Sequence, residues 1–223
     1  MNEAQTATAL HAWRLCESCA ESIFGLRPPT PAYADATARL LFMTVSHESD
    51  GFQARRQYTF AKREKRLPAL IATAHADNDR DAAREYEKTL ALVKVAGAFG
   101  LWQVERATGR YCLQWLAKRD ALLQRAYRWV QPRTAADVSL NQDDIGAATR
   151  LMCVSDGDAL SCLLARIKYL TIRTPNPRGI GEMALYAKRY YNTAGGSATS
   201  DDYRRAFERW WPCTQGQNEG VER

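Results

Sequence analysis

The chain has 223 residues, of which 25% are charged, and a formal net charge of +6. Its length suits one domain, or one domain with a subdomain. No apolar run approaches the roughly 20 residues of a bilayer-spanning helix, and no basic segment followed by an apolar core opens the chain, so we expect neither a membrane span nor a secretory signal.

The N-terminal 31 residues predict a helix followed by a proline-rich linker. Leu10, Trp13, Ala20 and Ile23 are spaced as on one face of a helix. Residues 27–31 then contain three prolines, which cannot continue a helix and which push each preceding residue into an extended conformation. We therefore expect this linker to lead into a second helix.

The second predicted helix ends at Glu48, the residue on which the functional interpretation depends. Ala34, Ala38, Leu41 and Val45 share one helical face, and that face reaches Glu48 just before a Ser-Asp-Gly turn. A carboxyl group placed against apolar walls has a raised pKa, and such a group can act as a general acid near neutral pH. The alternative interpretation is a solvated helix end or an ion-pair partner.

Residues 58–96 divide into two parts. Residues 58–78 are basic and irregular, and for their basic cluster we prefer a solvated face to a polyanion contact. That cluster consists of Lys62, Arg63, Lys65 and Arg66, just before Pro68. Residues 79–96 predict a helix, because Ala83, Tyr86, Leu90 and Val93 share one face.

A segment with two glycines and a single amide follows. Gly97 and Gly100 permit a close backbone approach or a positive φ angle. Large apolar side chains surround Gln103, and a buried amide must find hydrogen-bond partners. Gln103 therefore either satisfies backbone groups or holds a polar ligand.

The rest of the chain predicts further helices and no sheet. A long helix stops before Pro132, and the prolines at 175 and 177 end a later one. The predicted helix starts are Thr108, Asn141, Ser155 or Asp156, and Thr199. Because no segment shows sustained alternation of apolar and polar residues, the predicted fold class is mainly α.

The cysteines and histidines predict no metal site and no cofactor. Cys16 and Cys19 form the only close pair among six cysteines, and no second Cys or His pair at metal-ligand spacing accompanies them. The three histidines are scattered. We expect reduced, mostly buried thiols in a protein made in the cytosol.

The positive charge suggests a polyanionic partner, namely nucleic acid, an anionic membrane or an acidic cell-wall polymer. No recognised nucleic-acid-binding motif accompanies it, so we expect no nucleic-acid partner. The glycine-rich segment at 192–200 lacks the Gly-Lys-Ser/Thr ending of a phosphate-binding loop, and no Gly-x-Ser-x-Gly elbow is present.

Three sequence blocks in chain order carry a resemblance to a known family. Glu48-Ser49, followed by Gly-Ala-Phe-Gly-Leu-Trp-Gln at residues 97–103, resembles the soluble lytic transglycosylases and goose-type lysozymes. A closer resemblance is to lysozyme-like proteins of tailed bacteriophages. Their Glu-Ser-x-Gly-Leu-x-x-Arg-Arg-Gln, Gly-Leu-Phe-Gln-Met-Glu-x-Ala-Thr and Tyr-Tyr-Asn-Thr motifs are similar to residues 48–57, 100–108 and 190–193.

The resemblance implies a lysozyme-like helical domain at residues 32–212. Residues 58–96 then form a long insertion between the Glu48 helix and the Gly-Leu-Trp-Gln segment. Residues 1–31 are the N-terminal helix and linker, and residues 213–223 are a polar, frayed tail.

The resemblance also implies cleavage of the β-1,4 bond between N-acetylmuramic acid and N-acetylglucosamine in peptidoglycan. Glu48 protonates the glycosidic oxygen, and Glu105 is the first choice for a second carboxylate, ahead of Asp50 and Glu64. Without a second carboxylate, the N-acetyl group of the sugar acts as the nucleophile. The implied substrate-binding residues are Gln103, Tyr191 and Asn192, with Trp102 and Phe99 either stacking on sugar rings or packing in the core.

The implied partners are peptidoglycan glycan strands and other virion proteins, and the implied location is a phage virion or the host cytoplasm before release. The enzyme would be a muramidase (a hydrolase) or a lytic transglycosylase. The alternative is a virion structural or assembly protein that keeps a lysozyme-like shape with little or no catalysis, because a fold does not determine a function.

Overall fold

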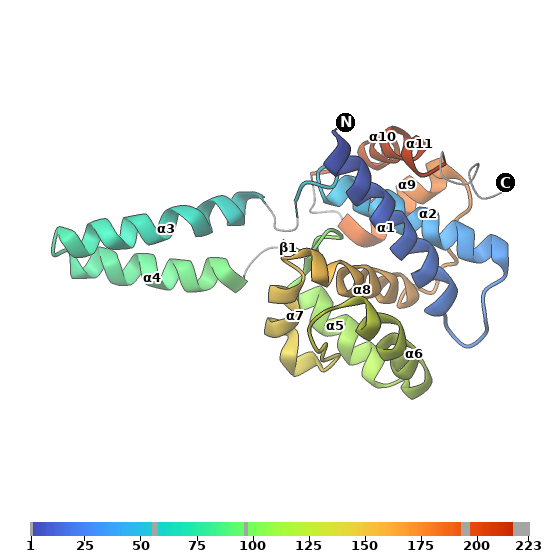
Figure 1. Ribbon diagram of the computed structural model, residues 1–223, viewed down its shortest axis with the longest axis horizontal. Coiled ribbons are helices and arrows are strands. Elements are labelled where there is room, and N and C mark those ends of the chain that lie inside the picture. The colour runs from blue at the N-terminus through green and yellow to red at the C-terminus, as the bar shows by residue number, and fades with distance from the viewer. Residues whose placement is uncertain (1, 55–57, 96–97, 193–196, 216–223) are drawn as a thin grey trace.

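The computed structural model describes residues 2–54, 58–95, 98–192 and 197–215. Over these residues the protein is mainly helical, which confirms the predicted fold class. Most helices pack into one body, and two of them project from it as an arm (Figure 1).

The long helices are α1 (Glu3–Ser22), α2 (Pro31–Glu48), α3 (Tyr58–Ala76), α4 (Arg80–Val95), α5 (Arg106–Ala117), α6 (Asp120–Val130), α8 (Asp158–Leu170) and α10 (Ser200–Trp210). The short ones are α7 (Ile145–Leu151), α9 (Ile180–Ala187) and α11 (Pro212–Gln215). Strands β1 (Ala98–Phe99) and β2 (Val104–Glu105) pair in antiparallel register, with Ala98 opposite Glu105. Three 3₁₀ turns, η1 (Gln131–Arg133), η2 (Gln142–Asp144) and η3 (Ser155–Gly157), and one π-helical turn, η4 (Lys188–Asn192), complete the structure.

Helix α2 is the central helix of the body, as predicted. Thr30 caps its first turn by accepting a hydrogen bond from the backbone N–H of Tyr33. Every residue from 40 to 46 is buried, because α1, α8, α9 and α10 pack around the helix. The buried hydroxyls of Thr44 and Ser46 donate to backbone carbonyls one turn earlier, at 2.8 and 2.7 Å. The last turn of α2 thus leaves the core at Glu48.

Helix α10 lies across the end of α2 and also confirms its predicted start. Thr199 and Asp202 form a reciprocal capping box at its first turn. Tyr203, Phe207 and Trp210 are buried on one face, at the spacing that the sequence indicates. Because this face contacts α2, Tyr203 reaches the end of the Glu48 helix.

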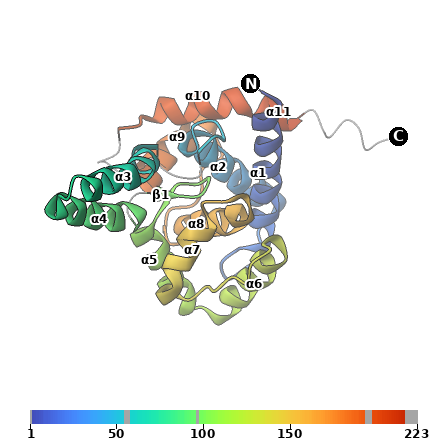
Figure 2. The same cartoon turned by 60° about the vertical axis from the view of Figure 1, so that its left-hand side comes forward.

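Helices α3 and α4 form the projecting arm, in which they lie side by side in both views (Figures 1 and 2). The predicted α4 is confirmed, but the prediction that residues 58–78 are irregular is wrong, since α3 runs to Ala76. Pro68 lies inside α3, where a proline costs a backbone hydrogen bond. The helix continues past it because Leu67 and Ala74 are buried in the hairpin, as are Ala83 and Val93 of α4.

Other predicted boundaries need correction. The long helix predicted from Thr108 is two helices that break at Lys118 and Arg119, and α5 already begins at Arg106. The Arg119 guanidinium lies 3.6 Å from the Trp115 ring centroid and donates to the Trp115 carbonyl, so it closes the end of α5. The α-helices predicted to start at Asn141 and Ser155 start at Ile145 and Asp158, each directly after a 3₁₀ turn.

The C-terminal segment is partly ordered. The short helix α11 covers residues 212–215, and Thr214 is buried, so the predicted frayed tail is wrong at its first residues. The remainder of the predicted tail, residues 216–223, lies outside the described residues, as do Gly97, Thr193 and the predicted Gly195-Gly196 loop.

Four of the six cysteines are buried, which confirms that the thiols are mostly buried. In the described part of the chain, no group of three or more His, Cys, Asp or Glu side chains is arranged to hold a metal ion. No helix in that part has the length and apolar character needed to cross a bilayer.

Candidate functional site

The position of Glu48 is fixed by a tight turn at the end of α2. The hydroxyl of Ser49 donates to the Val45 carbonyl at 2.6 Å and accepts from the backbone N–H of Phe52 at 2.8 Å. Asp50, Gly51 and Phe52 all have left-handed φ angles, of 50°, 64° and 66°. Such a run is rare and costly outside glycine, and it clusters at functional sites. At Gly51 a β-carbon would lie 2.9 Å from the Trp210 ring, so only glycine fits there without a shift.

The Glu48 carboxylate lies half-buried among hydrogen-bond donors and positive groups. The Tyr203 hydroxyl donates to Glu48 Oε1, and Asn192 is a second hydrogen-bond partner. Burial raises the pKa of Glu48, while Tyr203, His47, Asn192 and Lys168, in that order, act against the rise. Burial wins, and Glu48 therefore holds its proton to higher pH than an ordinary glutamate does.

Three tyrosines, Tyr169, Tyr191 and Tyr203, lie near this carboxylate. Tyr169 shares a 2.7 Å hydrogen bond with Thr44, and its ring centroid lies 5.6 Å from that of Tyr191. Burial raises the pKa values of Tyr169, Tyr191 and Tyr203, and the nearby charge of Glu48 adds to each rise. All three phenols therefore remain protonated donors when Glu48 ionises.

Gln103 is held by the backbone, one of the two roles that the sequence left open. Its φ angle is 47°, and its side-chain nitrogen donates to the carbonyls of Gly100 at 2.8 Å and Ala54 at 3.4 Å. These bonds connect the β1–β2 turn to the segment that follows Glu48. Gly100 is also required here, because its φ is 75° and a β-carbon would collide with Ser161. Binding of substrate by Gln103 stays a prediction.

Trp102 and Phe99 pack in the core, which is one of the two roles that the sequence left open for them, so neither ring is exposed for stacking on a sugar. Trp102 is 0% exposed and Phe99 is 2% exposed. The Trp102 indole donates to the Leu41 carbonyl at 3.0 Å, and its backbone N–H donates to the Ser161 hydroxyl at 3.2 Å. Trp102 therefore holds the β1–β2 turn against α2 and α8.

The other predicted site residues separate into two groups. Tyr191 and Asn192 of η4 lie near Glu48, and we call these three residues, with His47, Lys168 and Tyr203, the Glu48 cluster. The Tyr191 hydroxyl, however, donates to the Trp102 carbonyl at 2.6 Å, and Lys188 donates to Asn192 Oδ1 at 3.1 Å. Glu105 is exposed at the end of β2, and it is not among the groups that act most strongly on the pKa of Glu48. The role of Glu105 as the second carboxylate stays a prediction.

Sequence reasoning missed Tyr203, Lys168 and Tyr169 as members of this site. The sequence placed Tyr203 on the buried face of a capped helix, but nothing in that pattern indicates which residue the face contacts. Lys168 lies one residue before Tyr169 on α8, a helix whose pattern indicates only burial. The only sequence signal for Tyr203 and Tyr169 is a hydroxyl-bearing side chain on an otherwise apolar helix face, and this signal does not name the partner of the hydroxyl.

Two hollows flank the Glu48 cluster. One, of about 230 Å³, includes His47, Asp50 and Gly51 in its lining, and the other, of about 300 Å³, includes Lys168 and Tyr190. His47 and Lys168, two neighbours of Glu48, therefore each border a concave surface, and Glu48 itself is not among the residues of either lining.

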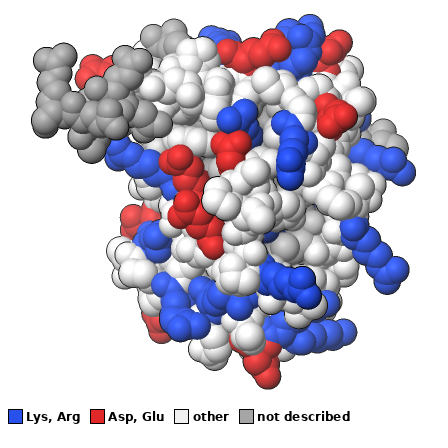
Figure 3. All heavy atoms as spheres, turned by 90° about the vertical axis from the view of Figure 1, so that its right-hand side faces the viewer, with Lys and Arg blue, Asp and Glu red and all other residues white. Residues whose placement is uncertain are grey.

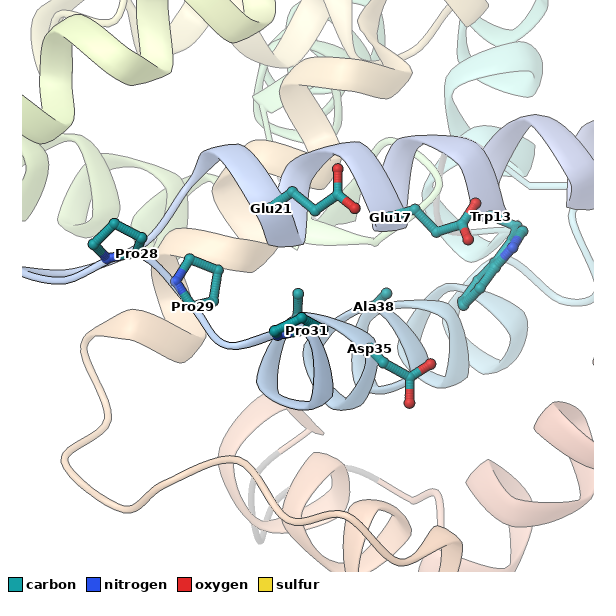
Figure 4. Close-up of a pocket in the computed structure, with 9 residues that line it drawn as sticks. Trp13, Glu17, Glu21, Pro28, Pro29, Pro31, Asp35 and Ala38 are labelled. Carbon is teal, nitrogen blue, oxygen red and sulfur yellow. The ribbon is translucent and has the colours of Figure 1, made fainter.

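A third pocket lies elsewhere, between α1 and the first half of α2 (Figure 4). Its volume is about 390 Å³, and its lining combines Trp13 and three prolines with the carboxylates of Glu17, Glu21 and Asp35. The last residue of α2 in this lining is Ala38, about 15 Å along the helix from Glu48 at 1.5 Å per residue. This acidic pocket is therefore distinct from the Glu48 cluster.

Many basic side chains serve the fold. On the face shown in Figure 3, Lys and Arg side chains are most frequent in the lower part of the view, and acidic ones gather above them. Around α6, Arg119, Arg125 and Arg133 each lie over an aromatic ring and donate to a backbone carbonyl. This use accounts for part of the net positive charge without a polyanionic partner.

Comparisons of the chain with protein-family models, with curated proteins and with solved structures found no match. The resemblance to lysozyme-like phage proteins therefore depends on the three sequence blocks, and the lysozyme-like arrangement stays a prediction.

Proposed function

We propose that the protein cleaves glycosidic bonds of peptidoglycan with Glu48 as its general acid. The observation that carries this proposal is the half-buried Glu48 carboxyl, whose pKa is raised by burial while Tyr203 donates a hydrogen bond to it. A catalytic acid needs both properties, because it must hold a proton near neutral pH and then release it. The first sequence block begins at the same residue.

The proposed reaction begins with proton transfer from Glu48 to the glycosidic oxygen between N-acetylmuramic acid and N-acetylglucosamine. The bond from that oxygen to the anomeric carbon breaks, and positive charge develops on the sugar as an oxocarbenium-like transition state. Glu48 becomes a carboxylate in this step. The hydrogen bonds from Tyr203 and Asn192 and the positive charge of Lys168 stabilise it, which favours release of the proton.

We favour attack by the sugar's own N-acetyl group over a second protein carboxylate. Lys168 is a cationic neighbour of Glu48, and Glu105 is exposed at a strand end. The N-acetyl oxygen forms a bond to the anomeric carbon as the leaving sugar departs. The 6-oxygen then attacks the same carbon and breaks that bond, and the ionised Glu48 takes up the proton of the 6-hydroxyl, so both the N-acetyl group and the enzyme return to their starting states. In the alternative path Glu105 assists the attack of a water molecule on the anomeric carbon, and the glycosidic bond is hydrolysed.

Mass spectrometry of fragments released from purified peptidoglycan tests this proposal. We expect soluble muropeptides, with ends lighter by one water if the anhydro path operates. A Glu105→Gln variant separates the paths, because a loss as large as that in Glu48→Gln indicates a two-carboxylate hydrolase, and a loss of a few-fold indicates N-acetyl participation. If wild-type protein releases no fragments, the proposed function is rejected.

The projecting arm favours a second candidate, a virion structural or assembly protein. Helices α3 and α4 contact each other far more than they contact the body (Figure 1). The exposed fraction of Leu92 is 68%, and a large exposed apolar side chain on such an arm suits a protein contact. Virions that contain the protein, and that lose it when Leu92 is changed to Ser, together with no muropeptide release, would support this candidate.

A further inference from the structure

A groove runs along the exposed side of α5, next to the Glu48 cluster. It consists of two adjoining hollows of about 300 and 450 Å³, which share Ala107 and Tyr111 in their linings. The first hollow is bounded by Lys168 and Tyr190, and the second continues along α5 past Arg106 and Arg110. We call these two hollows together the α5 groove.

The α5 groove is positively charged. Arg106, Arg110 and Lys168 line it, and no aspartate or glutamate belongs to the lining. Among the described residues, none of these three cations has a carboxylate oxygen within the 4.0 Å of an ion pair. A concave surface that gathers cations without acidic partners is suited to an anionic ligand.

Lys168 joins the α5 groove to the Glu48 cluster. Its ammonium lies 5.2 Å from the centroid of the Tyr191 ring, and its charge acts on Glu48. Tyr190, which lines the groove, immediately precedes Tyr191 and Asn192 in η4. A ligand that extends from the Glu48 cluster past Lys168 would therefore enter the groove.

We propose that the α5 groove binds the acidic peptide stem of a peptidoglycan strand whose sugars lie at Glu48. This inference depends on the proposed function. The stem carries free carboxylates, which Arg106 and Arg110 bind through charge-assisted hydrogen bonds, while Lys168 stands at the junction between stem and sugar. Tyr111 lines both hollows and Thr108 lines the first, so the groove also offers two hydroxyl groups. A peptide of a few residues suits this short groove better than a nucleic acid, which needs a longer positively charged track.

Binding measurements on a cleavage-impaired protein test the inference. Two soluble probes are compared by calorimetry with the Glu48→Gln variant: a short peptidoglycan glycan with peptide stems, and the same glycan after enzymatic removal of the stems. We expect the stems to tighten binding by about tenfold, as one or two charge-assisted hydrogen bonds would. Adding Arg110→Gln should remove most of that gain and leave binding of the stem-free glycan unchanged.

Arg128→Gln in the same background is the matched control, because Arg128 is an exposed arginine on α6, outside the groove. It removes the same charge as Arg110→Gln does. If both variants lost stem binding equally, net charge alone would explain the loss, and the inference would be overturned. Binding of the stem-free glycan without any gain from the stems would overturn it and leave the proposed function standing. Binding of neither glycan would contradict both. Salt-sensitive retention of a DNA oligonucleotide that depends on Arg110, with no gain from the stems, would assign the groove to nucleic acid.

Discussion

Glu48 and Glu17 are two carboxylates whose pKa values are raised by burial, and the neighbours that act most strongly on each have opposite effects on the pKa. Tyr203, His47, Asn192 and Lys168 all favour the ionised form of Glu48. Glu17 lies in the acidic pocket, where Glu21 and Asp35 raise its pKa further (Figure 4). Glu17 also remains exposed, whereas Glu48 is half-buried.

The difference shows that a raised pKa alone does not make a catalytic acid. At Glu17 the like charges of Glu21 and Asp35 oppose ionisation more strongly than Arg14 and the hydrogen bond from Trp13 favour it. At Glu48 desolvation holds the proton, and a ready set of donors stabilises the ion once the proton has gone. Only the second arrangement supports transfer of a proton to a substrate.

The largest expected difference is in activity. Glu48→Gln is nearly isosteric but has no proton to give, so we expect muropeptide release to fall by about 10²–10⁴-fold. Glu17→Gln makes the same chemical change on α1, in the acidic pocket that is distinct from the Glu48 cluster, and we expect the wild-type rate. The measurement compares the rates of muropeptide release by wild type and the two variants at equal protein concentration, and circular dichroism checks that each variant is folded. Equal losses in both variants would remove the distinction between the two sites.

The next difference is in the pH dependence of activity. The reaction requires protonated Glu48, so the rate falls as pH rises through the pKa of Glu48. Tyr203 lowers that pKa, and Tyr203→Phe should therefore move the alkaline limb to higher pH, by about one unit for one hydrogen bond to a charged group. Tyr186→Phe is the control, because the Tyr186 hydroxyl donates to the Thr174 carbonyl. A limb that stays in place or moves to lower pH in Tyr203→Phe would exclude this role of the phenol.

A smaller difference is expected in stability. The folded-state pKa of Glu48 is above its unfolded value, so its favourable contribution is complete below the unfolded pKa, about 4.3, and is lost as pH rises through the folded pKa. Gln does not titrate. The free energy of unfolding of Glu48→Gln should therefore rise relative to that of wild type between the unfolded and the folded pKa of Glu48. Above the folded pKa the difference should stay constant, on the order of 1 kcal/mol. Urea unfolding from pH 4 to 8 measures the difference. A variant that is less stable than wild type at pH 8 would show that ionised Glu48 stabilises the fold.

The smallest effect belongs to Glu17. Glu17 and Glu21 are four residues apart on α1, and like charges at that spacing destabilise a helix by about 0.2–0.5 kcal/mol. Glu17→Gln should recover about this much at low salt, and the gain should fade as salt screens the repulsion. Glu208→Gln is a control of opposite sign, because Glu208 accepts from Arg204 at 3.3 Å. Thermal melts of wild type and both variants at two salt concentrations test this prediction. A gain in the stability of Glu17→Gln that does not depend on salt would exclude charge repulsion as its cause.

The parts of the fold that the sequence predicted are those set by local pattern. Regular apolar spacing located α2 and its end at Glu48, and Thr199 located the start of α10. The same reasoning failed for α3, because its basic cluster and Pro68 conceal the residues that pack against α4. It also left Trp102 undecided between the core and a ligand. That question depends on the indole's bond to the Leu41 carbonyl, which joins residues 61 positions apart, and the bond from Tyr203 to Glu48 joins residues 155 apart. Contacts at such separations leave no periodic signal.

The central claim is that Glu48 is a partly desolvated acid whose proton drives the reaction. Carbon-13 NMR titration of the Glu48 carboxyl in active wild-type protein, set against the pH dependence of muropeptide release, tests it most directly. The account predicts a pKa for Glu48 above the usual value of about 4.3 and an alkaline limb of activity at the same pH. A pKa of Glu48 at or below that value, or a limb that does not coincide with its titration, would contradict the account.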